Sequence, residues 1–186
     1  MIEYRSMPVV GTDHYVFPGK FNPLHRGHLA IAHYVKDKFN KEIDFEIAVR
    51  NITKNQAGKI VVDGNLYRIV KQFLTIHRNL IITNDLSFVA KSSTFVGKTF
   101  CVGADVFYRI TDTVNYFQSV KETLRCIDII RNNGCRFLVF PRTEEQAICG
   151  IRIPKFIQDI TEYAEGFNIV NISSSEIRKR LAENNK

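Results

Sequence analysis

Hydrophobic positions along this chain switch repeatedly between a strand-like and a helix-like spacing. From residue 43 to residue 49 apolar and polar side chains alternate, which predicts a strand. Short apolar runs predict further strands at 15–17, 80–83, 99–102 and 136–140, with a short strand at 168–172. Apolar residues spaced three and four apart predict helices over 27–39, 65–77, 119–131 and from 173 onward. This alternation predicts an α/β fold with a largely parallel sheet.

The predicted order of elements fits a doubly wound, Rossmann-like sheet with helices on both faces. Residues 53–64 are polar and contain glycine, which predicts a long loop, and long loops in compact domains are often functional. Residues 142–163 give no clear pattern. Ser173 and Glu176 form a capping box at the start of the last helix. Ligands of doubly wound sheets bind beyond the carboxyl ends of the strands, so chemistry is expected directly after strands.

Length and composition indicate one globular domain over residues 1–186, with 1–14 as a short N-terminal lead. Hydrophobic residues make up 45% of the chain and charged residues 24%, and a chain of this size needs no disulfides to hold a core. No apolar run reaches the roughly 18 residues of a membrane helix, and residues 1–5 lack a signal-peptide pattern. None of the four cysteines forms a C-x-x-C pair. We therefore expect a cytoplasmic protein that does not engage membranes.

The formal net charge of +7 fits either a nucleic-acid binder or an enzyme that handles polyphosphates. The basic residues are spread along the chain, and the one tight cluster, at 178–180, is also explained by a solvated helix face. No RNP-like aromatic motif or helix-turn-helix pattern occurs, so a nucleic-acid partner is not expected.

The segment from Phe17 to His28 runs from a predicted strand through a turn rich in glycine, proline and asparagine into a predicted helix. Backbone N–H groups of such a turn, together with the N-terminus of the next helix, favour anions. His25 and His28 are three residues apart, so their rings share a face of the helix start. With Lys20 they can donate hydrogen bonds to phosphoryl oxygens. A zinc site would need a third ligand, and none is evident.

Three further groups follow predicted strands. Ser173, Ser174 and Ser175 stand at the start of the last helix, where free N–H groups and hydroxyls can hold phosphates, and Arg178 lies one turn further on. Gly103 and Asp105 follow the strand at 99–102; a glycine there admits a ligand and an acidic residue can accept hydrogen bonds from ribose hydroxyls. Arg142 follows the strand at 136–140. Each group alone is also explained by an ordinary helix cap, a turn or a solvated arginine.

Four motifs together resemble the nucleotidylyltransferase superfamily. Gly19 to His28 is close to its G-x-F-N-P-x-H-x-G-H signature, although many members carry Thr or Ser where Lys20 stands. Residues 172–178 resemble the I-S-S-T/S-x-I-R motif of the adenylyl-transferring branch, which favours adenine over cytosine.

The other two motifs resemble the nicotinamide or nicotinate mononucleotide adenylyltransferases within this superfamily. Gly103-Ala104-Asp105 is similar to their ribose contact, and Arg142 matches a position that often holds an arginine near the nucleotide. Residues 45–54 are similar to F-E-L-S-x-x-N-x-D-K of a subgroup, with Thr53 in place of the Asp.

The resemblance implies adenylyl transfer from ATP, with Mg²⁺, to a mononucleotide phosphate, which forms NAD or its acid form and releases pyrophosphate. It implies catalytic roles for Lys20, His25, His28 and Arg178, and acceptor-binding roles for Asn51 and Lys54. The residues implied in ATP binding are Gly19, Phe21, Asn22, Gly27, Gly103, Asp105, Arg142, Ser173, Ser174 and Ser175. It implies no metal ligand from the protein.

Several alternatives stay open. The same chemistry could act on another phosphorylated acceptor, such as pantetheine phosphate or a sugar phosphate, with ATP or CTP as donor. A nucleotide-binding sensor without turnover is the rival from another class. The sequence also leaves open whether the chain forms a homo-oligomer.

Overall fold

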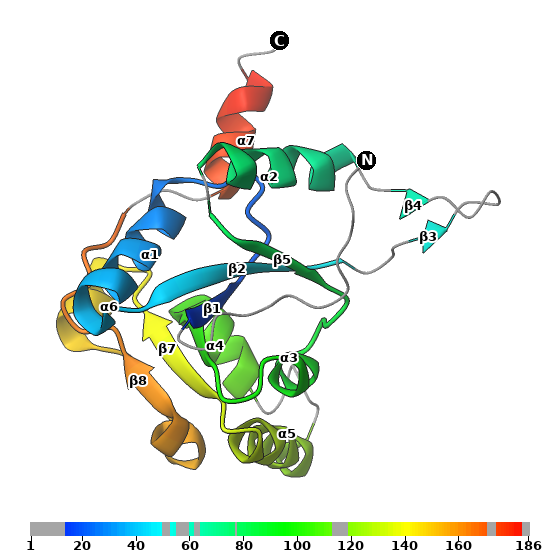
Figure 1. Cartoon of the computed structure of the whole chain (residues 1–186). Coiled ribbons are helices and arrows are strands. Elements are labelled where there is room, and N and C mark those ends of the chain that lie inside the picture. Colours follow the sequence, from blue (N-terminus) through cyan, green and yellow to red (C-terminus); the bar gives the residue numbers. More distant parts are fainter. Residues whose placement is uncertain are drawn as a thin grey trace.

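A parallel sheet of six strands forms the centre of the fold in a computed structural model of the chain (Figure 1). The structure describes residues 14–49, 53–54, 60–61, 64–76, 78–112, 119–170 and 174–183. Within these residues the sheet consists of β1 (His14–Pro18), β2 (Glu42–Ala48), β5 (Leu80–Thr83), β6 (Thr99–Gly103), β7 (Arg136–Phe140) and β8 (Thr161–Tyr163). Neighbouring strands run parallel in the order β5-β2-β1-β6-β7-β8. The predicted Rossmann-like α/β fold is confirmed.

Helices cover both faces of this sheet, as the sequence predicted. One face carries α1 (Arg26–Phe39) and α2 (Gly64–Thr75), whereas the other carries α3 (Phe88–Thr94), α4 (Ala104–Thr111) and α5 (Val120–Asn132) (Figure 1). A separate cluster of buried apolar residues lies on each face. Successive strand residues point to opposite faces, so Val16 of β1 belongs to one cluster and Phe17 to the other.

The two central strands, β1 and β6, mark the point where the strand order reverses. From β1 the chain proceeds outward to β2 and β5, and from β6 it proceeds the other way to β7 and β8. Ligand sites of doubly wound sheets lie at such a reversal, beyond the carboxyl ends of the strands. Gly19 directly follows β1 and Gly103 ends β6. Both predicted glycine turns therefore flank the position where the fold favours a ligand.

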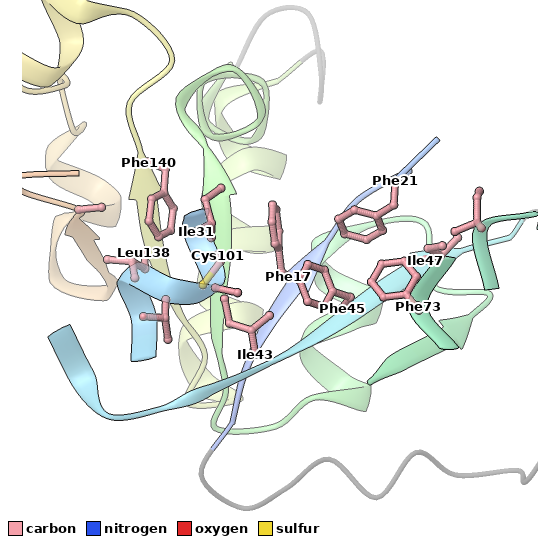
Figure 2. Packing of buried hydrophobic residues seen from close by; sticks show 14 of the residues in the cluster. Phe17, Phe21, Ile31, Ile43, Phe45, Ile47, Phe73, Cys101, Leu138 and Phe140 are labelled. Atoms are coloured by element: carbon pink, nitrogen blue, oxygen red, sulfur yellow. The ribbon is translucent and has the colours of Figure 1, made fainter. Parts of the chain in front are cut away.

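Phenylalanines fill the α1/α2 face near the carboxyl end of β1. Phe17 from β1, Phe45 from β2, Phe73 from α2 and Phe21 from the loop after β1 lie together (Figure 2). The ring of Phe21 meets each of the other three edge-on, with centroids between 5.2 and 5.4 Å apart. None of the four is more than 4% exposed. The side chain of Phe21 thus anchors the loop after β1 in the core.

Two stretches differ from the sequence-based prediction. Residues 53–64, predicted as a loop, contain the short antiparallel strands β3 (Thr53–Lys54) and β4 (Ile60–Val61). The strand predicted at 168–172 is wrong over the described residues 168–170, which are irregular. The edge strand is instead β8, which begins directly after the 3-10 helix η1 (Lys155–Ile160), so no turn residue marks its start in the sequence.

Short helices account for most of what the pattern did not predict. The helix α3 is only seven residues long and rich in serine and threonine, and α4 begins directly at the end of β6. The helix α6 (Glu144–Cys149) lies in the segment without a clear pattern. The predicted last helix is α7 (Ser174–Glu183).

Some predictions about the chain ends fall partly outside the described residues. Ser173, the first residue of the predicted capping box, is one of these, and so are residues 1–13 of the predicted lead. His14, the last residue of that lead, begins β1. Among the described helices, none combines the length and the apolar character needed to cross a membrane.

Candidate active site

The loop from Gly19 to His25 connects β1 to α1 and is fixed from two sides. The amide of Gly19 donates to the carbonyl oxygen of Glu46 at 2.9 Å, which continues the pairing of β1 with β2. Phe21 adopts a positive φ of 45° and turns its ring into the core. A Cβ at Gly19 would lie 2.6 Å from Phe21 Cζ, so only glycine leaves room for this ring. The peptide bond between Asn22 and Pro23 is cis.

His25 and His28 lie at the start of α1 with their rings stacked. The ring centroids are 3.7 Å apart and the planes are inclined by 23°. The amide of His25 donates to Nδ1 of His28 at 3.3 Å. The ring of His28 also meets Phe17 and Phe21 edge-on, at centroid distances of 5.8 and 5.0 Å. The buried rings of Phe17 and Phe21 thus hold the ring of His28 in place.

Both imidazoles are neutral at physiological pH. Burial lowers the pKa of His28 to about 3, with further contributions from His25 and from Arg142. Burial, followed by the charge of Arg142, also lowers the pKa of His25. A neutral imidazole carries one N–H, and Nδ1 of His28 accepts a hydrogen bond, so its proton resides on Nε2. His28 therefore offers an N–H donor from a fixed ring.

This depressed pKa makes a prediction about stability. Below pH 6.5 the unfolded chain binds a proton at His28 that the folded chain, with a pKa of about 3, does not bind. Lowering the pH through this window therefore favours unfolding, and the free energy of unfolding contributed by this group should fall by about 2 kcal/mol from pH 7 to pH 5. Urea unfolding at both pH values should show a smaller fall for His28→Asn. An equal fall in the two proteins would contradict the assignment.

Asp105 and Arg142 lie together just beyond the carboxyl ends of β6 and β7, next to Gly103, the last residue of β6. Nε of Arg142 donates to Oδ1 of Asp105 at 2.9 Å, and the side chains are 44% and 56% exposed, respectively. A Cβ at Gly103 would lie 2.4 Å from Arg142 Nε and 2.6 Å from Asp105 Oδ1, so this glycine gives the ion pair its space. Arg142 is also close enough to lower the pKa of both histidines. Residues after three different strands thus converge.

The C-terminal helix meets the same loop. Nη1 of Arg178, on α7, donates to the backbone oxygen of Asn22, 156 residues earlier in the chain. Asn22 stands three residues before His25. The two motifs that lie near opposite ends of the sequence are therefore adjacent in the folded molecule.

The remaining predicted site residues fall into three groups. Lys20 is exposed in the loop after β1, and Gly27 lies in the first turn of α1. Phe21 is 1% exposed, so its ring packs in the core and leaves only its backbone to a ligand. Asn51 and Ser173 lie outside the described residues, as do the side chains of Lys54, Ser174 and Ser175.

Sequence reasoning missed a residue that fixes Arg142. Oε1 of Gln146, on α6, accepts from the amide of Arg142 at 2.8 Å, and the backbone oxygen of Gln146 accepts from the hydroxyl of Tyr163 at 2.6 Å. A glutamine four residues after an arginine gives no signal by itself. Its importance depends on β8, which the sequence pattern did not reveal.

Sequence reasoning also missed the buried pair of Glu46 on β2 and Lys91 on α3. Their side chains are joined at 2.6 Å, and neither residue is more than 4% exposed. The alternating pattern of β2 was compatible with a solvated face, because polar residues at every second position usually point to water.

Comparison with known proteins gives a consistent picture. The family model described as "Cytidylyltransferase-like" matches residues 16–180. A protein of Fervidobacterium nodosum named "Probable nicotinate-nucleotide adenylyltransferase" is 26% identical over 185 residues, covering 90% of this chain and 80% of its own length. A protein of Caldicellulosiruptor saccharolyticus with the same name is 27% identical over 175 residues, covering 91% of this chain and 86% of its own length.

Proposed function

This chain belongs to the cytidylyltransferase-like family and is a nucleotidyltransferase, and we propose that it transfers AMP from ATP to nicotinate or nicotinamide mononucleotide. The observation that carries the proposal is the contact of Arg178 with Asn22, which joins the two nucleotide motifs at the strand reversal. The relatives named as probable nicotinate-nucleotide adenylyltransferases support adenylyl transfer as the reaction, and we take the proposed pyridine mononucleotide acceptor from their names.

The proposed reaction is a direct displacement. A phosphate oxygen of the mononucleotide attacks the α-phosphorus of ATP, the bond from that phosphorus to the bridging oxygen breaks, and pyrophosphate leaves with the electron pair. The nucleophile is already an anion, so no side chain has to remove a proton. The protein must instead align two anions and neutralise the oxygens as charge moves to the leaving group.

The proposed roles follow from the geometry and charge of the site. His28 donates from Nε2 to a phosphoryl oxygen, and the stacked His25 ring lies alongside it. Arg178 and Lys20 supply fixed positive charge for the oxygens of the leaving pyrophosphate. Asp105 accepts from the ribose hydroxyls, and Arg142 supplies charge near the phosphates. Because Nδ1 of His28 already accepts a hydrogen bond and burial lowers the pKa of His28 to about 3, the ring acts as a hydrogen-bond donor from Nε2 and not as a base.

The expected Mg²⁺ fits the nucleotide better than the protein. Among the described residues, no three His, Cys, Asp or Glu side chains converge as metal ligands. Magnesium in phosphoryl-transfer sites is bound largely by substrate phosphates and water. We therefore assign the ion to ATP, where it would offset charge on the phosphates.

A screen of acceptors tests the proposed function. The purified protein would be incubated with ATP and Mg²⁺ and with nicotinate mononucleotide, nicotinamide mononucleotide, pantetheine phosphate or a sugar phosphate in turn. We expect pyrophosphate release and a dinucleotide of the correct mass with a pyridine mononucleotide, and weaker turnover when CTP replaces ATP. Tight ATP binding without release of pyrophosphate from any acceptor would instead indicate a nucleotide sensor.

Gly103→Ala should weaken nucleotide binding while leaving the fold intact. The added Cβ would displace the ends of the Arg142 and Asp105 side chains, which are partly exposed and free to move. Loss of one hydrogen bond to a charged group corresponds to a weakening of about tenfold or more in ATP affinity. Isothermal titration with ATP would measure this, alongside an unchanged melting temperature. An unaltered affinity would remove Asp105 and Arg142 from the proposed ATP site.

A further inference from the structure

The buried ion pair between Glu46 and Lys91 lies beneath the carboxyl edge of the sheet, close to the proposed site. Glu46 is the third residue from the end of β2 and is fully buried, and Lys91 of α3 is 4% exposed. Lysine and glutamate are rarely this buried unless they are paired. Phe45 and Ile47, the neighbours of Glu46 on β2, belong to the α1/α2 cluster, so Glu46 faces α3.

The pair joins the ends of several segments. Oε1 of Glu46 accepts from Lys91 Nζ at 2.6 Å and from the hydroxyl of Thr83, at the end of β5, at 2.5 Å. Lys91 Nζ also donates to the backbone oxygen of Asp85, in the connection between β5 and α3, at 2.6 Å. The backbone oxygen of Glu46 accepts the amide of Gly19, the first residue of the loop that leads to the histidines. One residue therefore connects β2, β5 and α3 to that loop.

Stability alone does not account for such a pair. Two charges leave water to form it, and well-packed apolar residues of similar volume are often equally or more stable. Oε2 of Glu46 is buried and has no hydrogen-bond partner within the part of the chain that the structure describes. A carboxylate that is only partly satisfied is costly, so the pair points to a requirement for one exact arrangement of these segments.

We propose that Glu46 and Lys91 are positioning residues. Their buried ion pair holds the ends of β2 and β5, and this keeps the loop from Gly19 to His25 in the position that adenylyl transfer requires. The inference rests on the proposed function for its kinetic test. Catalysis by alignment is sensitive to small displacements, since a shift of about 1 Å far from the chemistry can cost about 100-fold. Loss of the pair should therefore lower kcat and have little effect on the affinity for ATP.

The double variant Glu46→Met/Lys91→Met separates positioning from stability. It removes both charges together and keeps similar volumes, so we expect it to unfold near the wild-type temperature, whereas Lys91→Met alone leaves a buried carboxylate unpaired and should be strongly destabilised. We expect kcat of the double variant to fall about 10- to 100-fold, with KM for ATP changed by less than about threefold. Recovery of both stability and kcat would show a merely structural pair and overturn the proposal.

A second readout does not depend on activity. Hydrogen exchange at the Gly19 amide reports its bond to Glu46, and we expect it to quicken in the double variant without any nucleotide present. Unchanged exchange would overturn the proposal even if the wild-type protein transfers nothing to any acceptor. If the wild type showed no turnover but exchange were faster in the variant, the proposed function would be rejected, whereas the positioning of the loop by the ion pair would be supported.

Two further variants complete the test. Asp44→Asn is the matched control, because Asp44 lies on the same strand and face, is 1% exposed and also has one buried oxygen without a hydrogen-bond partner among the described residues. Its other oxygen accepts from His14 and Asn79, further from the site, so kcat should stay within about twofold.

If the double variant fails to fold, Thr83→Val still removes one bond to Glu46 and should lower kcat about two- to tenfold. An unchanged kcat and Gly19 exchange in that variant would overturn the proposal.

Discussion

Replacement of His28 by alanine is expected to lower kcat by about 10²–10³-fold, which corresponds to about 2.7–4 kcal/mol of lost transition-state stabilisation. The side chain offers a neutral N–H from Nε2, held by the amide of His25 and by the rings of Phe17 and Phe21. A donor fixed in advance costs no reorganisation when charge develops on a phosphoryl oxygen. Steady-state pyrophosphate release, with circular dichroism to verify the fold, would measure the effect.

His33→Ala provides the matched control for this prediction. His33 lies on the same helix but is exposed on the side away from the core, so its removal should leave kcat unchanged. His28→Asn keeps an N–H donor of shorter reach and should recover part of the activity. Normal turnover by folded His28→Ala protein would exclude the histidine from the reaction and with it the proposed mechanism.

The sequence predicted the centre of this molecule well because its signals there are local. A buried strand, a turn of glycine, proline and asparagine, and an amphipathic helix follow one another from residue 15 to residue 39, and the structure has β1, the loop and α1 in these places. The histidines are three residues apart on one helix start, so their proximity follows from helix geometry. The parallel pairing of the strands likewise follows from the alternation of strands and helices.

Contacts between distant segments could not be predicted in the same way. No local pattern places Arg178 against Asn22, and only the shared family resemblance linked their motifs. The resemblance also implied that Phe21 binds ATP, and the burial of its ring leaves only its backbone for that role. A positive φ at a phenylalanine is rare and cannot be inferred from residue type.

The hydrophobic pattern also did not predict which polar side chains are buried. Alternation along β2 predicted a strand but not the burial of its polar residues: Asp44 and Glu46 are 1% and 0% exposed, and Glu46 is joined to Lys91 of α3. The helix α3 is short and rich in serine and threonine, so the hydrophobic pattern did not predict a helix packed against Glu46. The partner of a buried charge can be predicted only if the helix or strand that carries the partner has been predicted.

Gly19→Ala should damage both stability and activity, because the added Cβ has no space. It would lie 2.6 and 2.8 Å from two carbons of the Phe21 ring. That ring is 1% exposed and is enclosed by Phe17, Phe45 and Phe73, so it cannot move aside as a flexible side chain would. Overpacking of this kind typically costs about 1–3 kcal/mol in the free energy of unfolding.

Displacement of the Phe21 ring should also lower activity, because this ring contacts His28 at a centroid distance of 5.0 Å. A shift of about 1 Å in the histidine would lower kcat by about 100-fold. Gly97→Ala is the control: Gly97 has a φ of 73° and no heavy atom within 4 Å of the added Cβ, so backbone strain should reduce stability while kcat stays unchanged. Urea unfolding and steady-state kinetics would compare the two variants. If Gly19→Ala lost stability but kept full kcat, the packing of Phe21 would be irrelevant to the placement of His28.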